Sequence, residues 1–163
     1  MSEHKIDQKV KYKADDPVWQ VHEFGVDLSA SQIYLFGVDS YVLNQSEGST
    51  DEPGVEFLMA NKFIKNMNML MRKNPEKPIL IHMKTCGGDW QEGMAIYNMI
   101  KSCPNPVTIL SYTHARSMSS LIFQAANKRV MMPDSYYMIH DGDGVLAGTQ
   151  KLKINPVLRA QRL

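Results

Sequence analysis

The sequence predicts an α/β fold, in which helices pack in layers against a sheet. Two amphipathic helical segments, 57–73 and 90–102, alternate with short apolar runs of strand length, of which 79–83 and 107–112 are the clearest. Proline, glycine and asparagine stand between these segments and mark turns. The 163 residues suit one domain, because domains commonly run from about 100 to 200 residues.

The N-terminal third contains less regular patterns. Residues 1–17 are polar and charged, and we interpret them as an arm that precedes the domain of residues 18–163. Apolar runs predict short strands within 18–26 and at 33–38. The stretch 44–54 is rich in Ser, Gly, Asp and Pro with almost nothing to bury, and it predicts a surface loop.

Two helices are predicted most clearly. In the segment 57–73 apolar residues recur at three-and-four spacing, which places them on one helical face. The prolines of 74–78 end that helix, because proline cannot continue it, and the apolar run 79–83 follows as a buried strand. Segment 90–102 repeats the helical pattern, and Asp89 is placed to cap its start.

The C-terminal half continues the alternation of strands and helices. We predict a strand at 107–112, a helix at 117–127, and strands at 129–132 and 135–140. The tail, 141–163, mixes glycine turns with basic residues and predicts no final helix.

Composition excludes several classes of protein. The chain has 18 basic and 17 acidic residues, so no charged surface is predicted that would attract nucleic acid or a membrane. Cys86 and Cys103 have neither disulfide-framework nor zinc-site spacing, so we expect reduced thiols and no metal site. The N-terminus lacks a signal-peptide core, and no apolar run approaches the roughly 18 residues of a membrane span. A soluble cytoplasmic protein is expected.

Two strand-to-helix junctions, 84–89 and 113–119, are candidates for chemistry. Each puts small residues where a helix N-terminus exposes unpaired backbone N–H groups. At the second junction Ser117 would expose its hydroxyl at the mouth of the sheet, as an acyl-transfer nucleophile requires, and the Met118 N–H would point into the same space. The Gly87-Gly88 turn could add a second donor.

A serine nucleophile needs a base within hydrogen-bond reach to take its proton. His140, at the end of a predicted strand, is the candidate. Taken singly these features are weak, because serine often caps helices and strand-end histidines are more often structural. Asp141 would point to the opposite face of a strand and Asp143 falls in a glycine turn, so neither is assigned to a triad.

Two other histidines are interpreted as structural. His82 lies in the apolar run 79–83 and is expected to be a core histidine with satisfied hydrogen bonds. His114 could contact a substrate, yet a structural role in its loop is favoured.

At this point the residues resemble a known family. The segments KPILIHMKTCGGDWQEGMAIYNMIKS and VTILSYTHARSMSSLIFQAANKRVMMPDSYYMIH are similar to the proteolytic subunit of the Clp protease, with the likeness running from about Ile33 to His140. The matching points are the Gly-Gly turn before a helix, the Ser-Met pair that opens the next helix, the Pro-Asp-Ser turn, and Met-Ile-His closing a strand. Together they are specific.

The resemblance implies roles for individual residues. Ser117 would be the nucleophile, His140 the general base, and the backbone N–H groups of Gly88 and Met118 the oxyanion hole. The family's third triad member is an aspartate downstream of the histidine, on a stretch that this chain does not contain, so the domain of 18–163 is interpreted as lacking its C-terminal part.

The resemblance also implies a fold and partners. The family's fold is a spiral of repeated strand-strand-helix units, shared with the crotonases, and its protomers form heptameric rings that enclose a chamber. ATPase unfoldases of the Clp type feed unfolded polypeptides to these rings. The chain would act as a serine endopeptidase subunit with no cofactor of its own, because the partner uses the ATP.

Departures from the family leave two alternatives open. The usual Gly-x-Ala-Ala before the serine is 113–116 here, with Arg116 beside the nucleophile, and the glycine after Ser-Met is Ser119. An arginine there would either face a wet chamber or pair with an acid. One alternative is a catalytically inactive ring subunit. The other is a crotonase-type acyl-CoA enzyme, which shares glycine-rich oxyanion loops but does not need the Ser-Met and Met-Ile-His pairs.

Overall fold

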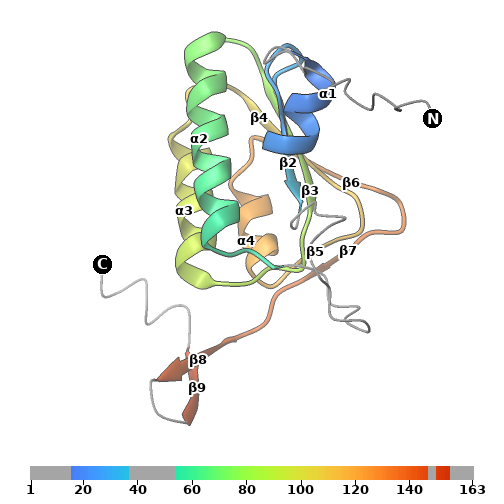
Figure 1. The fold of residues 1–163 in the computed structure, drawn as a ribbon. Coiled ribbons are helices and arrows are strands. Elements are labelled where there is room, and N and C mark those ends of the chain that lie inside the picture. The colour runs from blue at the N-terminus through green and yellow to red at the C-terminus, as the bar shows by residue number, and fades with distance from the viewer. Residues whose placement is uncertain (1–15, 37–53, 147–149, 155–163) are drawn as a thin grey trace, which may run out of the picture.

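A computed structural model describes residues 16–36, 54–146 and 150–154, without the side chains beyond Asp141 (Figure 1). Its elements in chain order are α1 (Pro17–Trp19), the π-helical turn η1 (Gln20–Phe24), β1 (Val26–Asp27), β2 (Gln32–Phe36), α2 (Phe57–Lys73), β3 (Ile79–Lys84), α3 (Trp90–Ser102), β4 (Val107–Ser111), β5 (His114–Arg116), α4 (Met118–Gln124), β6 (Lys128–Met131), β7 (Tyr136–Met138), β8 (Gly142–Leu146) and β9 (Gln150–Ile154).

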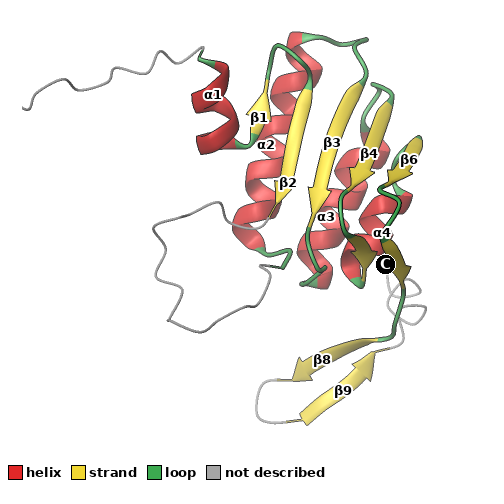
Figure 2. Cartoon of the chain, turned by 90° about the vertical axis from the view of Figure 1, so that its right-hand side faces the viewer, coloured by secondary structure: helices red, strands yellow, loops and turns green. Residues whose placement is uncertain are grey.

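A five-stranded sheet with strand order β1-β2-β3-β4-β6 forms the centre of the fold. Strands β2, β3, β4 and β6 run parallel, and the short β1 pairs antiparallel with β2. Helices α2, α3 and α4 connect the parallel strands and all lie over the same face of the sheet (Figure 2). This is the layered α/β fold that the sequence predicts.

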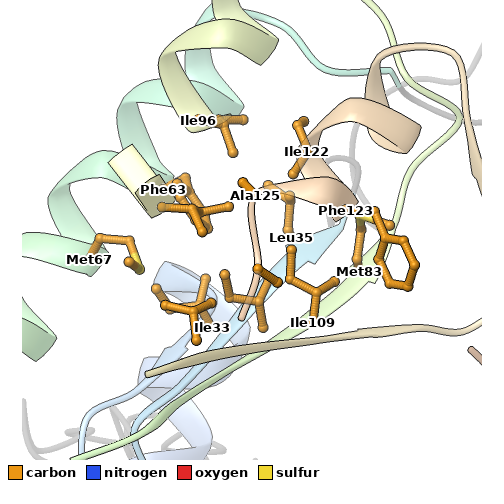
Figure 3. Packing of buried hydrophobic residues seen from close by; sticks show 14 of the residues in the cluster. Ile33, Leu35, Phe63, Met67, Met83, Ile96, Ile109, Ile122, Phe123 and Ala125 are labelled. Carbon is orange, nitrogen blue, oxygen red and sulfur yellow. The ribbon is translucent and has the colours of Figure 1, made fainter. Parts of the chain in front are cut away.

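The core lies between that face and the three helices. Ile33, Ile81 and Ile109 are paired across three adjacent strands and are fully buried. Side chains from α2, α3 and α4 pack onto this row, among them Met67, Ile96 and Ile122 (Figure 3). Because each buried aliphatic side chain contributes about 1.5–3 kcal/mol, this layer holds the helices in place on the sheet.

Both clear helix predictions have the predicted bounds, and Asp89 caps α3 as expected. The strand predicted within 18–26 is wrong for residues 18–24, which are helical. Pro17 starts this helical segment, the Asp16 carboxylate accepts the Val18 N–H, and Gly25 ends it with a φ of 64°. These local start and stop signals outweigh the apolar pattern, which spans only a few residues.

The later strands differ in extent from the prediction. The last predicted strand spans only Tyr136–Met138, so His140 lies two residues beyond its end. The unpredicted β5 (His114–Arg116) pairs with it in parallel, apart from the main sheet. Three residues are too few to show a periodic pattern, which explains why the sequence did not reveal β5.

The predicted helix at 117–127 is shorter, because α4 ends at Gln124. A hairpin of β8 and β9 takes the place of the predicted glycine turns in the tail. The predicted arm up to residue 15, positions 37–38 and the loop 44–53 lie outside the described residues.

The second face of the sheet has no described helix over it (Figure 2). His82 points to this face and is only 9% exposed, because its ring stacks on Tyr34 with 4.5 Å between centroids. Its Nδ1 lies 2.8 Å from the Tyr112 hydroxyl and its Nε2 lies 3.0 Å from the Gln32 side-chain oxygen. The expectation of a histidine with satisfied hydrogen bonds is confirmed. None of the described helices is long and apolar enough to cross a membrane.

Burial lowers the pKa of His82 below its ordinary value of 6.5. As pH falls, His82 is protonated at a higher pH in the unfolded chain than in the folded protein. The free energy of unfolding therefore decreases as pH drops from about 6.5 through the lowered pKa of the folded state. We expect His82→Gln to remove this part of the pH dependence in urea unfolding curves measured on both sides of that window. The control is His22→Gln at an exposed histidine, which should keep the wild-type profile. An unchanged acid loss in His82→Gln would contradict the prediction.

Candidate active site

The segments that start α2 and α3 meet backbone to backbone. Val55, just before α2, forms a parallel bridge with Gly88, just before α3. The Val55 N–H donates to the Gly87 carbonyl, and the Asp89 N–H donates to the Val55 carbonyl over 2.9 Å. Gly88 lies between the two residues that hydrogen-bond to Val55. In a parallel bridge, the N–H of such a residue points away from the partner segment. The Gly88 N–H is therefore on the side of the loop opposite Val55, and Gly88 is exposed.

The same loop touches the segment that starts α4. Gly87 has a φ of 97°, and a Cβ added to it would lie 2.8 Å from both the Ser117 Cβ and the Met118 nitrogen. Gly88 has a φ of 145°, and a Cβ there would collide with the Val55 backbone. Only glycine fits these two positions, because both the backbone angles and the space exclude a side chain.

Ser117 has an unusual backbone conformation. Its φ is 52° and its ψ is −131°, a region that non-glycine residues adopt at a cost of about 1–3 kcal/mol. Glu56 and Asp89 cap α2 and α3 with their side chains, but Ser117 makes no such bond at the start of α4. The capping explanation for this serine is therefore wrong, and its hydroxyl is not used by its own helix.

Several hydrogen bonds hold the strained residue. The Ser117 N–H donates to the Met138 carbonyl over 3.1 Å, and the Ser120 hydroxyl donates to the Ser117 carbonyl over 2.6 Å. The fully buried Ser119 hydroxyl accepts the Arg116 N–H over 2.9 Å and donates to the Arg116 carbonyl over 2.7 Å. The serine that replaces the family's glycine thus fixes the peptide unit directly before Ser117.

The pairing of β5 with β7 determines where His140 lies. Arg116 is opposite Met138 in this parallel register, so Ser117 is level with residue 139 and His140 is the next residue along. Paired strands lie about 4.8 Å apart and rise about 3.3 Å per residue, which brings the two backbones within reach of an imidazole. The His140 side chain is exposed, and in the described part of the chain no hydrogen bond joins it to the Ser117 hydroxyl.

Met118 anchors the start of α4. Its side chain is buried and lies against Gly93 of α3, where a Cβ would come within 2.6 Å of the methionine sulfur. Its backbone nitrogen is in contact with Gly87, so the two candidate oxyanion donors, the N–H groups of Met118 and Gly88, come from loops that touch each other. Two amides on touching loops are a candidate pair for stabilising a developing oxyanion.

Two residues close to Ser117 in sequence have structural contacts. The Arg116 guanidinium donates to the Tyr136 hydroxyl over 3.2 Å. His114 is 8% exposed, its ring lies 5.5 Å from that of Tyr136, and its carbonyl accepts the Ser111 hydroxyl over 2.8 Å. These contacts agree with a structural role for His114.

The two aspartates after His140 lie in different settings. Asp141 is exposed. Asp143 lies in β8 opposite Lys153, and not in the predicted glycine turn. The site residue that sequence reasoning missed is Val55, whose sequence signal is its place two residues before a predicted helix.

Comparison with known proteins identifies relatives over the same region. The family model described as Clp protease matches residues 51–157. The ATP-dependent Clp protease proteolytic subunit of Deinococcus radiodurans is 33% identical over 96 residues, which cover 58% of this chain and 47% of that protein. The ATP-dependent Clp protease proteolytic subunit 2 of Treponema denticola is 33% identical over 84 residues, which cover 50% of this chain and 42% of that protein. The chain thus spans less than half the length of these relatives.

Solved structures share the fold. ClpP1 from Listeria monocytogenes superposes with a TM-score of 0.57 at 22% identity, covering 69% of this chain and 58% of that one. A mutant of the same protein gives a TM-score of 0.59 at 22% identity, covering 72% and 60%. The predicted ClpP-like α/β fold is confirmed by these superpositions.

We expect Gly93→Ala to destabilise the protein by about 1–3 kcal/mol, because its new methyl group collides with the Met118 side chain. In an exposed helix the same change would stabilise by up to about 1 kcal/mol. Urea unfolding distinguishes the two signs. Gln91→Ala, an exposed change on the same helix, should be close to neutral. A stabilised Gly93→Ala variant would disprove the close contact.

We expect Ser119→Ala to cost about 1–3 kcal/mol in the free energy of unfolding, because it leaves the Arg116 N–H without its acceptor. The matched control is Ser102→Ala, which removes an exposed hydroxyl that donates to a helix carbonyl. Thermal or urea unfolding of both variants measures the difference. Equal, small effects would show that Ser119 does not brace the turn.

Proposed function

The chain belongs to the Clp protease family, and from this premise we propose that it is a serine-type endopeptidase subunit of an ATP-dependent protease. The observation that carries the proposal is the conformation of Ser117. This residue has a φ of 52°, and its carbonyl accepts a hydrogen bond from the Ser120 hydroxyl. Its own side chain does not cap α4. A strained serine at a strand-to-helix turn, with a hydroxyl that does not cap its own helix, is typical of an acyl-transfer nucleophile.

In the proposed reaction the Ser117 oxygen attacks the carbonyl carbon of a peptide bond while His140 takes its proton. The carbonyl oxygen becomes an oxyanion, which accepts hydrogen bonds from the N–H groups of Gly88 and Met118. When this intermediate collapses, the C–N bond breaks and His140 gives its proton to the departing amine. Water, activated by His140, then hydrolyses the acyl-enzyme and restores the serine.

The proposed partners follow from the family. Both relatives are named as proteolytic subunits of an ATP-dependent protease, so we propose that an ATPase unfoldase of the Clp type supplies this chain with unfolded polypeptides. We further propose a homo-oligomer, with heptameric rings, in the cytoplasm. ATP would be used by the unfoldase, so this chain needs no cofactor of its own. Nucleic acid and membranes are not among the proposed partners.

The main prediction concerns covalent labelling. A fluorophosphonate probe should label the protein at Ser117, and Ser117→Ala should abolish labelling because the attacking oxygen is gone. His140→Gln should slow labelling by about 10²–10⁴-fold, the usual contribution of a general base. Gel fluorescence and peptide mapping by mass spectrometry measure both effects, with Ser102→Ala as the control at an exposed serine.

Labelling that persists in Ser117→Ala would refute the nucleophile assignment. A folded, assembled protein that is never labelled would instead favour the inactive ring subunit. A rise in melting temperature with an acyl-CoA, together with absent labelling, would favour the crotonase-type alternative.

A further inference from the structure

We propose that the segment Gly54–Glu56, which precedes α2, is a positioning element of the oxyanion hole, holding the Gly87-Gly88 loop in place against Ser117. This inference rests on the proposed function, because it assigns a catalytic consequence to the position of that loop. It assigns no chemistry to the segment itself. The segment acts through the backbone amide of Gly88.

Hydrogen bonds give the first argument. Val55 commits both of its backbone polar groups to the loop, its N–H to the Gly87 carbonyl and its carbonyl to the Asp89 N–H. These two bonds flank Gly88 on either side along the chain. They immobilise the Gly88 peptide unit while leaving its N–H on the opposite side of the loop. A donor that is fixed in place but not consumed is what an oxyanion hole requires.

Packing gives the second argument. A Cβ on Gly54 would lie 2.7 Å from the Gly87 carbonyl oxygen, and a Cβ on Gly87 would lie 2.8 Å from the Ser117 Cβ. No side chain separates these three backbone layers. A shift of the first layer must therefore be transmitted to the second, since close-packed backbone cannot absorb it.

The anchoring of the segment gives the third argument. Val55 is 2% exposed and belongs to the hydrophobic core, and the Glu56 carboxylate accepts the N–H groups of Leu58 and Met59 at 2.8 Å and 2.7 Å. α2 and the core therefore anchor the segment through contacts other than those it makes with the loop. The loop contains two glycines with positive φ, which are free to adopt other conformations unless an outside contact restrains them.

The kinetic signature of such a role is specific. An oxyanion donor acts on the transition state, so its misplacement lowers kcat and leaves KM almost unchanged. Removing one donor outright costs about 10²–10³ in kcat. Displacing it by a few tenths of an ångström should cost less, on the order of tenfold.

The test variant is Gly54→Ala, whose methyl group would push against the Gly87 carbonyl. With a small peptide ester, we expect kcat to fall by about tenfold or more and KM to stay within about twofold. A peptide boronic acid, whose tetrahedral adduct places an oxygen in the hole, should bind more weakly by a similar factor. If Gly54→Ala does not fold, Val55→Ala is the second variant. It loosens the anchor in the core without removing the backbone hydrogen bonds, and we expect it to lower kcat by a few-fold.

A stability control separates positioning from general destabilisation. Asn105→Ala removes a buried amide that donates to the carbonyls of Asn74 and Lys77, beyond the C-terminal end of α2 and away from the site. It should lower the melting temperature at least as much as Gly54→Ala and leave kcat within about twofold when assayed well below that temperature. A parallel loss of kcat in Asn105→Ala, or an unchanged kcat in Gly54→Ala, would overturn the inference.

The fluorophosphonate reaction of the unmodified protein distinguishes failure of this inference from failure of the proposed function. If the unmodified protein is labelled but Gly54→Ala reacts at the same rate, the function stands and the inference is overturned. If the unmodified protein is never labelled, the proposed function fails, and hydrogen exchange of peptides covering residues 84–90 still tests the positioning. Faster exchange in Gly54→Ala supports it, and unchanged exchange overturns it.

Discussion

Direct backbone contact between the segments that start α2, α3 and α4 is the constraint on which the site depends. Val55 bridges Gly88, and Gly87 lies against Ser117, with glycine wherever a Cβ would separate the layers. The parallel sheet makes this possible, because the helices that follow parallel strands all start at the same edge. The core beneath the helices fixes the N-terminal ends of α2, α3 and α4 relative to one another. The packing of the whole helical layer therefore sets the positions of the candidate donors and the candidate nucleophile.

The departures from the family pattern are compatible with a well-ordered turn at Ser117. Ser119 stands where the family has a glycine, and its hydroxyl is buried. That hydroxyl accepts a hydrogen bond from the Arg116 N–H and donates one to the Arg116 carbonyl. Arg116 itself donates to the Tyr136 hydroxyl. These bonds restrain Arg116, the residue before Ser117. Ser117 has a positive φ, which persists only where neighbouring contacts restrain the backbone. Neither departure therefore argues by itself for an inactive subunit.

Much of the fold could be predicted because its strongest signals are local. The spacing of apolar residues in 57–73 predicts which face of that helix is buried, and Asp89 is an N-cap signal for the start of the next helix. The failures have equally local causes. Residues 18–24 have an apolar pattern that fits a strand, but Pro17 and Gly25 start and end a helical segment there. β5 is three residues long, and it forms by pairing with β7, which lies 22 residues later in the chain.

The sequence by itself determined the order of strands and helices between residues 57 and 111 and the residue types at the site, since periodicity, prolines and the Gly-Gly and Ser-Met pairs are properties of neighbouring residues. Only the tertiary structure decided that Val55 pairs with Gly88 and that the Ser117 backbone hydrogen-bonds to Met138. It also decided that the Ser117 hydroxyl is left out of helix capping. These are contacts between segments about twenty or more residues apart, and their formation depends on the burial of the shared core, which no local pattern encodes.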